Sequence, residues 1–232
     1  MNTKKEFLKS LSIFSSLSDA EINRLAEVTE EFTYKNGDYI FYEGDSPNWL
    51  CMVKEGNVKA IKQLEDGKEI ILHMFTTGDI FGELAVFDRR PYPASAMSMG
   101  QASILKLHYS QCIDLFEKMP DVAIKIMKGM GIKQRNFVER LEEALTARVE
   151  KRIANTLIKL ANINPAEDMD ECRKNIDLHL TRKDIANMVG TTIETAIRVM
   201  SKFQKEGIIE STKGSITILK PAMLIEKAQE QY

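Results

Sequence analysis

The spacing of apolar residues changes several times along the chain, and the first regular pattern is helical. Residues 18–31 (SDAEINRLAEVTEE) place apolar side chains three residues apart, at Ile22, Leu25 and Val28. Ser18 stands at the start of this run and Glu21 follows three residues later, which is the pattern of a capping box. We therefore expect a short amphipathic helix that begins at Ser18.

From Phe32 to about Leu107 the chain consists of short runs rich in aromatic and β-branched residues. Turn-forming sequences separate these runs about every ten residues. They are NG (36–37), EGD (43–45), EG (55–56), EDG (65–67), TGD (77–79) and PYP (91–93). Short strand-like runs with regular turns predict an all-β meander or roll.

Helical spacing returns from about Ser110 to Ala161, and no proline occurs between Pro120 and Pro165. Within this stretch one seam of positions steps by three and four residues: Met130, Gln134, Phe137, Leu141, Ala144 and Arg148. A period near 3.5 residues is typical of a helix that pairs with a second copy of itself, so we expect a homodimer. Because Gln134 and Arg148 interrupt the apolar seam, the alternative is a helix packed on its own domain.

Pro165 and the acidic segment AEDMDE (166–171) predict a surface loop, and IDLHL (176–180) is typical of a short strand. A chain of 232 residues is long enough for two domains. The pattern as a whole predicts an α+β protein. Its expected parts are a jelly-roll-like β-roll in residues 1–118, a long helix in residues 119–149 and a second domain in residues 150–232.

The composition is that of a globular protein, with 44% hydrophobic and 28% charged residues. The cysteines, Cys51, Cys112 and Cys172, form neither a CxxC motif nor a Cys/His cluster. This argues against a disulfide framework and a structural zinc site. The N-terminus MNTKKEFLKSLSIF lacks the apolar core of a signal peptide, and no run approaches the ~20 apolar residues of a membrane span. We expect a cytoplasmic protein without membrane contact.

Basic residues concentrate toward the C-terminal end. Residues 1–147 contain 18 basic and 22 acidic side chains, whereas residues 148–232 contain 14 and 12. In residues 178–220 the numbers are seven and four. A local basic excess is what contact with nucleic acid requires.

Residues 181–203 (TRKDIANMVGTTIETAIRVMSKF) predict two short helices joined by a turn. Thr181 can cap the first helix with Asp184 three residues later, and Gly190 can adopt the positive φ of a sharp turn. Thr192 can cap the second helix. The expected buried faces are Ile185 and Met188 in the first helix, and Ala196, Val199, Met200 and Phe203 in the second. Two such helices form a helix-turn-helix.

With that face buried, the opposite side of the second helix carries polar residues suited to DNA: Thr191, Glu194, Thr195, Arg198 and Lys202. Arg198 can donate two hydrogen bonds to O6 and N7 of guanine, and Glu194 can accept one from N4 of cytosine. The threonines and Lys202 can bind phosphates. The alternative is a solvated Glu–Arg pair four residues apart on a helix.

The following segment, EGIIESTKGSITILK (206–220), favours the DNA-binding interpretation. Its strand-like IIE and SITIL runs flank STKG, which predicts a tight hairpin with Lys213 near the tip. A helix-turn-helix followed by a two-stranded hairpin with a basic tip is a winged helix-turn-helix, whose wing can lie along the phosphate backbone.

The chain resembles the Crp/Fnr family, named after the cyclic-AMP receptor protein and the fumarate and nitrate reduction regulator, over nearly its whole length. The resemblance rests on GDIFGELAVF (78–87), RIANTLIKLA (152–161) and LTRKDIANMVGTTIETAIRVMSKFQKEGII (180–209). It implies a cyclic-nucleotide-binding-type roll, a dimerisation helix and a transcription regulator. It also implies a palindromic operator with TTGxx or TGTGA half-sites, with RNA polymerase as a partner.

The resemblance also implies roles for individual residues. Glu194 and Arg198 would read bases, and Ile193 and Ile197 would tune the choice of operator. The other expected DNA contacts are Thr181, Arg182, Thr191, Thr192, Thr195, Lys202 and Lys213. The expected effector pocket comprises His73, Gly82, Glu83, Leu84, Ala94, Ser95, Lys133 and Phe137.

The effector side departs from the pattern of cyclic-nucleotide binders. Gly82, Glu83 and Leu84 match, but Ala94 stands before Ser95 where those proteins have the arginine that neutralises the cyclic phosphate. Two other arginines, Arg89 and Arg90, lie earlier in the loop. Phe137 and Val138 stand where Thr and Ser contact the purine. A buried phosphate without a cation would be poorly compensated, so we expect a different small molecule or a gas as effector.

Other cofactors and functions agree less well with the residues. An iron–sulfur cluster is not expected, because no cysteine precedes Cys51. Haem is the alternative, with His73 or Met74 as ligand, in a regulator that responds to nitric oxide or redox state. A cyclic-nucleotide-binding module without a DNA role is a second alternative. An enzyme on a cupin-like roll is not expected, because His73, His108 and His179 are too scattered for a metal site.

Overall fold

The computed structural model describes residues 3–65, 67–164, 173–176, 180–212 and 215–229. The chain divides into two compact units. The first comprises Met1–Gln63 and Leu72–Asn136, and the second comprises Leu64–Ile71 and Phe137–Tyr232. Helices and strands occur in both, so the fold class is α+β as predicted. No helix in the described ranges is long and apolar enough to span a membrane.

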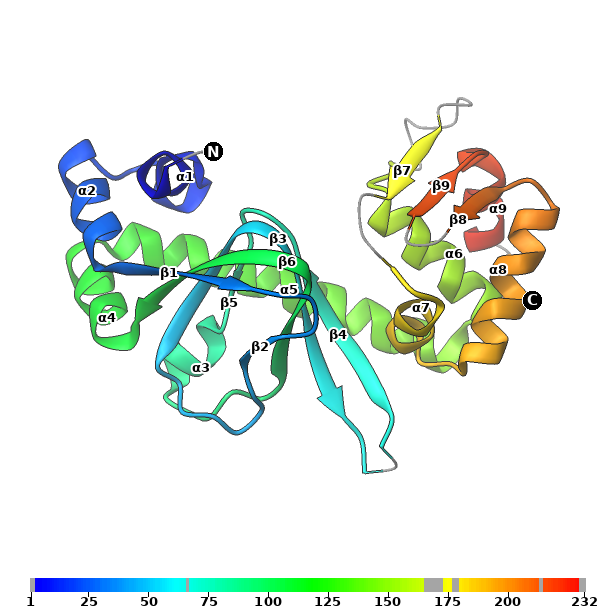
Figure 1. Cartoon of the computed structure of the whole chain (residues 1–232), viewed down its shortest axis with the longest axis horizontal. Helices are drawn as coiled ribbons and strands as arrows, with labels where there is room; N and C mark the ends of the chain where they lie inside the picture. The colour runs from blue at the N-terminus through cyan, green and yellow to red at the C-terminus, as the bar shows by residue number, and fades with distance from the viewer. Residues whose placement is uncertain (1–2, 66, 165–172, 177–179, 213–214, 230–232) are drawn as a thin grey trace. The chain divides into compact units, whose positions relative to one another are not determined.

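The first unit is built on a six-stranded sheet (Figure 1). Its strands are β1 (Thr29–Tyr34), β2 (Tyr39–Phe41), β3 (Trp49–Gln63), β4 (Glu69–Phe75), β5 (Ile80–Phe81) and β6 (Ser95–His108). The main order is β1-β6-β3-β4, with β2 paired to β6 and β5 paired to β3. Strands β1, β2 and β3 all run antiparallel to β6. The predicted roll is therefore present, with β6 as its central strand.

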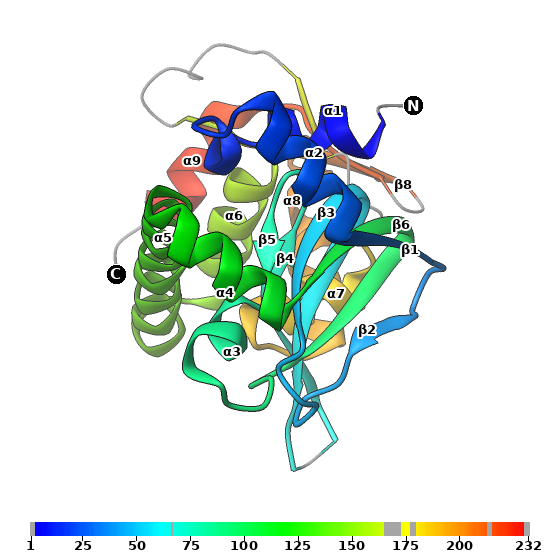
Figure 2. The ribbon, with the colours of Figure 1, turned by 90° about the vertical axis from the view of Figure 1, so that its left-hand side faces the viewer.

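Helices cover one end of this sheet (Figures 1 and 2). They are α1 (Lys4–Ser10), a 3₁₀ turn η1 (Ser12–Phe14), α2 (Asp19–Val28) and α4 (Tyr109–Lys118). The capping box of α2 is confirmed, since the backbone nitrogen of Ser18 donates to Oε2 of Glu21 at 2.7 Å. The helix ends at Val28 rather than Glu31, because residues 29–34 pair with β6 instead.

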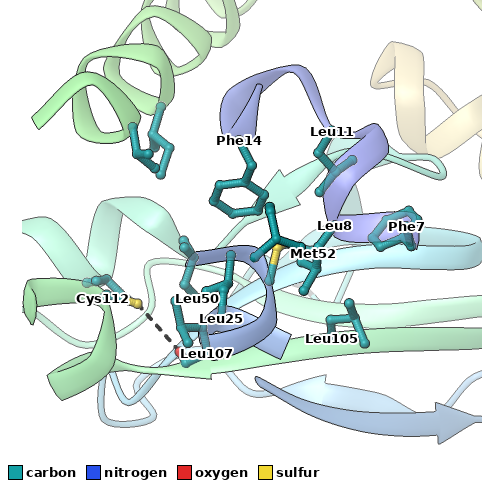
Figure 3. Close-up of a cluster of buried hydrophobic side chains, with 14 residues drawn as sticks. Phe7, Leu8, Leu11, Phe14, Leu25, Leu50, Met52, Leu105, Leu107 and Cys112 are labelled. Atoms are coloured by element: carbon teal, nitrogen blue, oxygen red, sulfur yellow. Dashed lines mark hydrogen bonds between the residues drawn. The ribbon is translucent and has the colours of Figure 1, made fainter. Parts of the chain in front are cut away.

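Alternate residues of the central strands pack into two separate clusters. Leu50, Met52, Leu105 and Leu107 face the N-terminal helices, where Figure 3 shows Leu8 and Phe14 next to Met52. Cys51, Val53 and Ile104 face the other side and pack with the aromatic residues of the roll. This is the period of two that a strand buried on both faces imposes.

The turn predicted at residues 55–56 is wrong, because β3 runs through it as one strand. Gly56 lies in a β-bulge, where the register with β6 shifts between Val53 and Asn57. Its φ is +83°, and a Cβ atom there would collide with the carbonyl oxygen of Gln101. In a regular strand odd-numbered and even-numbered residues face opposite sides. Across the bulge this alternation is interrupted, so Cys51 and Val53 before it and Val58 after it all pack in the same cluster.

The long helical stretch is three helices: α4, α5 (Pro120–Thr146) and α6 (Val149–Leu160). In α5 the predicted seam is partly wrong. Met130 packs with the buried Ile126 against the core of its own unit. Two other members of the seam, Phe137 and Leu141, are exposed as a pairing surface requires. Four further exposed apolar side chains of the helix lie outside the predicted seam: Ile124, Met127, Ile132 and Val138.

The second unit combines helices with a small sheet of order β7-β9-β8 (Figure 1). Besides α6 it contains β7 (Lys174–Ile176), α7 (Arg182–Val189), α8 (Ile193–Lys205), β8 (Ile209–Thr212), β9 (Ser215–Ile218) and α9 (Pro221–Gln229). Of the strand expected at 176–180, Ile176 belongs to β7, which begins at Lys174. Residues 177–179, the loop 166–171, Cys172 and Lys213 lie outside the described residues. Helix α9, which packs against α6, was not anticipated.

Candidate nucleic-acid interface

Both helices of the helix-turn-helix begin at the predicted threonines. The hydroxyl of Thr181 accepts a hydrogen bond from the backbone nitrogen of Asp184 at 3.1 Å, and the backbone nitrogen of Thr181 donates to the Asp184 carboxylate at 3.0 Å. The hydroxyl of Thr192 accepts from the backbone nitrogen of Thr195 at 3.3 Å. Between the helices Gly190 has a φ of +65°. The caps and the turn are confirmed.

The buried face of α8 is the predicted one. Ala196, Val199, Met200 and Phe203 are all buried. In α7 the prediction holds for Ile185 but not for Met188, which is only half-buried. Ala186 and Val189 are buried in its place. The helix is therefore rotated slightly from the expected orientation, which does not change the exposed side of α8.

The exposed side of α8 presents two charged residues between two apolar ones. Ile193 and Ile197 are 40% and 44% exposed, and Glu194 and Arg198 are exposed beside them. The ion pair between Glu194 and Arg198 that would form on a solvated helix is absent. Across the described chain, neither side chain has a hydrogen bond or ion-pair partner. Both groups are therefore available to an incoming ligand.

Arg182 is engaged within the unit. Its guanidinium donates to Oε1 of Gln204 at 3.3 Å, and Nε2 of Gln204 donates to the carbonyl oxygen of Ser211 at 3.2 Å. These bonds connect α7, α8 and β8. Partial burial lowers the pKa of Arg182, because desolvation disfavours its charged form. Arg182 thus holds the wing strand and the two helices together.

Lys202 also has partners that the sequence did not reveal. Its Nζ lies 2.7 Å and 3.0 Å from the two carboxylate oxygens of Glu150 in α6. Glu206 and Lys227 complete the group, since Lys227 lies 3.9 Å from Glu150 and 3.7 Å from Glu206. Lys227 comes from α9, a helix that was not predicted, so this cluster could not be anticipated.

In the roll, the structure brings together two of the predicted pocket residues. Gly82, with a φ of +80°, turns the chain from β5 into α3 (Glu83–Asp88). The Glu83 carboxylate is buried, and Nζ of Lys133 in α5 lies 2.6 Å from it. The same ammonium donates to the carbonyl oxygen of Ile80 at 2.6 Å. The expected pocket therefore contains an internal ion pair.

The loop that carries arginine in cyclic-nucleotide binders is packed into the core. The ring of Tyr92 stacks on Phe41 with centroids 3.8 Å apart, and its hydroxyl donates to the carbonyl oxygen of Trp49 at 2.7 Å. Next to it Ala94 is buried. The hydroxyl of Ser95 accepts from the backbone nitrogen of Glu43 at 2.9 Å. The sequence reasoning missed Tyr92, although an aromatic residue between two prolines was a visible signal.

The nearby arginines do not substitute for the missing one. The guanidinium of Arg89 lies 3.8 Å above the ring of Tyr109, and Arg90 is exposed. Leu84 and Phe137, two further residues assigned to the pocket, are 48% and 50% exposed. Among the described residues, the cation next to Glu83 in this expected pocket is therefore Lys133 rather than an arginine.

The surroundings of His73 do not fit a haem. His73 and Phe75 share one face of β4, with ring centroids 4.6 Å apart, while Met74 lies on the other face. Phe75 in turn stacks on Phe81 at 5.0 Å. A haem beside His73 would have to displace these packed rings. In the described ranges no three metal-ligating side chains come together.

Comparisons with known proteins match both units. Residues 31–119 match the family model described as cyclic nucleotide-binding domain. Residues 151–227 match the one described as Crp-like helix-turn-helix domain. These matches cover the roll and the helix-turn-helix.

Curated relatives span nearly the whole chain. The fumarate and nitrate reduction regulatory protein of Vibrio cholerae is 29% identical over 95% of this chain and 88% of its own. The CRP-like cAMP-activated global transcriptional regulator of Mycobacterium tuberculosis is 24% identical over 97% and 99%.

Solved structures share the fold. FixK2 from Bradyrhizobium japonicum matches with a TM-score of 0.75 at 21% identity, over 88% of this chain and 100% of its own. TTHA1359, a CRP/FNR-family transcriptional regulator from Thermus thermophilus, matches with a TM-score of 0.67 at 27% identity, over 88% and 100%.

Proposed function

Because this chain belongs to the Crp/Fnr family of DNA-binding transcription regulators, we propose that it acts as a homodimer that reads a palindromic DNA site through α8. We further propose that its β-roll controls the affinity for DNA. The named relatives are transcription regulators rather than enzymes. The proposed domain organisation is a sensing roll in residues 1–118, a dimerisation helix in residues 119–149 and a DNA-binding domain in residues 150–232.

The observation that carries the proposal is the open pair of Glu194 and Arg198 on α8. Both are exposed and have no partner in the part of the chain that the structure describes. Arginine can donate two parallel hydrogen bonds to guanine, and glutamate can accept from cytosine. Ile193 and Ile197 flank them and can contact thymine methyl groups. The hydroxyls of Thr181 and Thr192 donate to Asp184 and Thr195 in the free protein, so their phosphate contacts would need the hydroxyl hydrogen to turn to the phosphate, or a backbone N–H to donate in its place.

The exposed apolar residues of α5 support the homodimer. Met127, Val138 and Leu141 are each about half exposed, at 52%, 53% and 51%. Together with Ile124, Gly131 and Gln134 they follow alternating steps of three and four residues, the heptad spacing of a paired helix. Gly131 has no side chain, which permits close approach of a second helix. Two copies related by a twofold axis would present two α8 helices to the two halves of a palindrome.

The roll supports an effector other than a cyclic nucleotide. Ala94 is buried where a cyclic phosphate would need a cation, and Tyr92 fills part of the adjoining space. The remaining residues assigned to this site are His73, Gly82, Glu83, Leu84, Ser95, Lys133 and Phe137. RNA polymerase is the expected protein partner of the DNA-bound dimer.

The proposal is tested by selecting duplexes from a randomised pool with the full-length protein and measuring affinity for the selected duplex and a scrambled one. Arg198→Ala should weaken binding to the selected duplex by about 1–3 kcal/mol and relax the choice at one base pair. Lys205→Ala removes a cation from the same helix and should affect both duplexes alike. If Arg198→Ala also weakens both equally, Arg198 does not read a base; failure to enrich any sequence would contradict the proposed function itself.

A further inference from the structure

Lys202 belongs to the same side of α8 as the two proposed base-reading residues. Glu194, Arg198 and Lys202 follow at intervals of four residues, which aligns their side chains along one stripe of the helix. Unlike the other two, Lys202 is held by an acid. Both oxygens of Glu150 lie within 3.0 Å of its Nζ. The stripe therefore ends in a neutralised cation.

Glu150 lies in the first turn of α6, and its carboxylate is the centre of a small cluster. Lys227 approaches it to 3.9 Å, and Glu206 lies 3.9 Å from Lys202. Among the described residues, two acids and two lysines from α6, α9 and the C-terminal end of α8 meet here, and the formal charges of these four cancel. A DNA backbone approaching α8 would meet no net positive charge at this point.

We propose that Glu150 competes with the DNA backbone for Lys202: the carboxylate holds the ammonium in the free protein, and a phosphate replaces it in the complex. This inference rests on the proposed DNA-binding function. Carboxylate and phosphate oxygens are both acceptors for an ammonium group. The exchange is physically accessible, because the Lys202 and Glu150 side chains are 47% and 26% exposed and exposed ion pairs are weak.

The consequence concerns the part of DNA affinity that does not depend on sequence. Each lysine that binds a phosphate releases condensed counterions and makes binding more sensitive to salt. Because the Glu150–Lys202 ion pair must break before Lys202 can bind a phosphate, Glu150 reduces the affinity that this contact contributes. Glu150 therefore lowers affinity for all DNA by the same factor and leaves the ratio between selected and scrambled duplexes unchanged.

The test is a double-mutant cycle on the full-length protein with the selected and scrambled duplexes. Glu150→Gln should tighten binding to both by roughly two- to fivefold. It should also steepen the slope of log affinity against log salt by up to about one. Lys202→Gln should weaken both. In the Lys202→Gln background, Glu150→Gln should have no effect beyond that of a general charge change.

That general charge effect is measured with Glu226→Gln. Glu226 is an exposed carboxylate of α9 in the same unit, and the structure gives it no bond to Lys202. Glutamine keeps the length of glutamate, and the unfolding temperature of each variant verifies that it is folded. A gain from Glu150→Gln that equals the Glu226→Gln gain, or that persists without Lys202, overturns the inference.

The two proposals can fail separately. If Arg198→Ala removes the preference for the selected duplex while Glu150→Gln changes nothing, DNA reading stands and the competition is refuted. If the wild-type protein does not distinguish the duplexes, the DNA-binding proposal fails first.

Discussion

The ammonium of Lys133 in α5 lies 2.6 Å from the carboxylate of Glu83 at the start of α3. Glu83 has only 9% of its side chain exposed, whereas Lys133 has 30%. The lysine also lies 5.2 Å from the ring of Phe75. The buried carboxylate of Glu83 is thus neutralised by a lysine of α5. A change in this ion pair would therefore alter a direct contact between α3 and α5.

Lys133→Met should destabilise the first unit by about 1–2 kcal/mol, because it leaves the Glu83 carboxylate buried without a cation while water can still reach part of the site. Urea unfolding followed by the fluorescence of Trp49, the single tryptophan, measures this. The double variant with Glu83→Gln should recover part of the loss. Lys118→Met, which breaks the exposed pair with Asp114, serves as control and should change little. Equal effects of the two lysine variants would show that the Lys133 pair adds no stability.

Gly82→Ala should destabilise the roll more than Gly44→Ala. Both glycines have positive φ, at +80° and +87°, so an alanine is strained at either position. A Cβ at Gly82 would also lie 2.9 Å from the carbonyl oxygen of Trp49, whereas Gly44 has open space. We expect losses of roughly 2–4 and 1–2 kcal/mol, respectively, in the same urea assay. Similar losses would contradict the close approach at Gly82.

Val138→Asp should convert the proposed dimer into monomers. A carboxylate in an apolar helix seam would be desolvated without a partner, which should raise the dimer dissociation constant by at least roughly tenfold. Sedimentation equilibrium measures this. Ile132 is 58% exposed but lies off the heptad positions, so Ile132→Asp is the matched control. A dimer that tolerates Val138→Asp but not Ile132→Asp would place the interface on another face of α5.

Stability of the first unit should decline at alkaline pH. Burial raises the pKa of the Cys51 and Cys112 thiols from 9.0 to about 12. The unfolded chain therefore releases these protons from pH 9, while the folded state holds them until about pH 12. Stability is fully present below pH 9 and falls as pH rises toward 12, by up to about 1.4 kcal/mol per pH unit for each thiol.

The double variant Cys51→Ala/Cys112→Ala tests the source of this decline. Its free energy of unfolding, compared with that of the wild type across the same pH range, should fall less steeply. Burial also raises the pKa of Tyr92, so a smaller decline should remain in the double variant. An unchanged slope would show that the thiols do not contribute.

Local sequence rules correctly predicted where three helices start. Ser18, Thr181 and Thr192 each start a helix as expected, because a short polar side chain followed three residues later by its partner satisfies free backbone groups without help from elsewhere. The buried face of α8 followed equally from periodicity. The open state of Glu194 and Arg198 could not be predicted, since a pair four residues apart can equally well close on itself.

Features that depend on distant residues were missed. Met130 fits a heptad by spacing, yet it packs against a core whose members come mostly from α1, η1, α2, β3 and β6 instead of joining a seam. The sequence around Lys202 contains no sign of Glu150, which lies 52 residues earlier and is brought beside it by the fold. In both cases the decisive contact comes from outside the local window that sequence periodicity samples.

The bulge at Gly56 restricts where residues can be inserted into or deleted from this chain. Because the β3 side chains in the aromatic cluster change from odd to even positions across this irregular stretch, removing or adding one residue there would turn one half of β3 over and expose Val58 or Cys51. Length variation is therefore tolerable in the connection after Gln63 but not within this strand. Homologous chains should accordingly keep a fixed number of residues between Trp49 and Gln63, even where their sequences diverge.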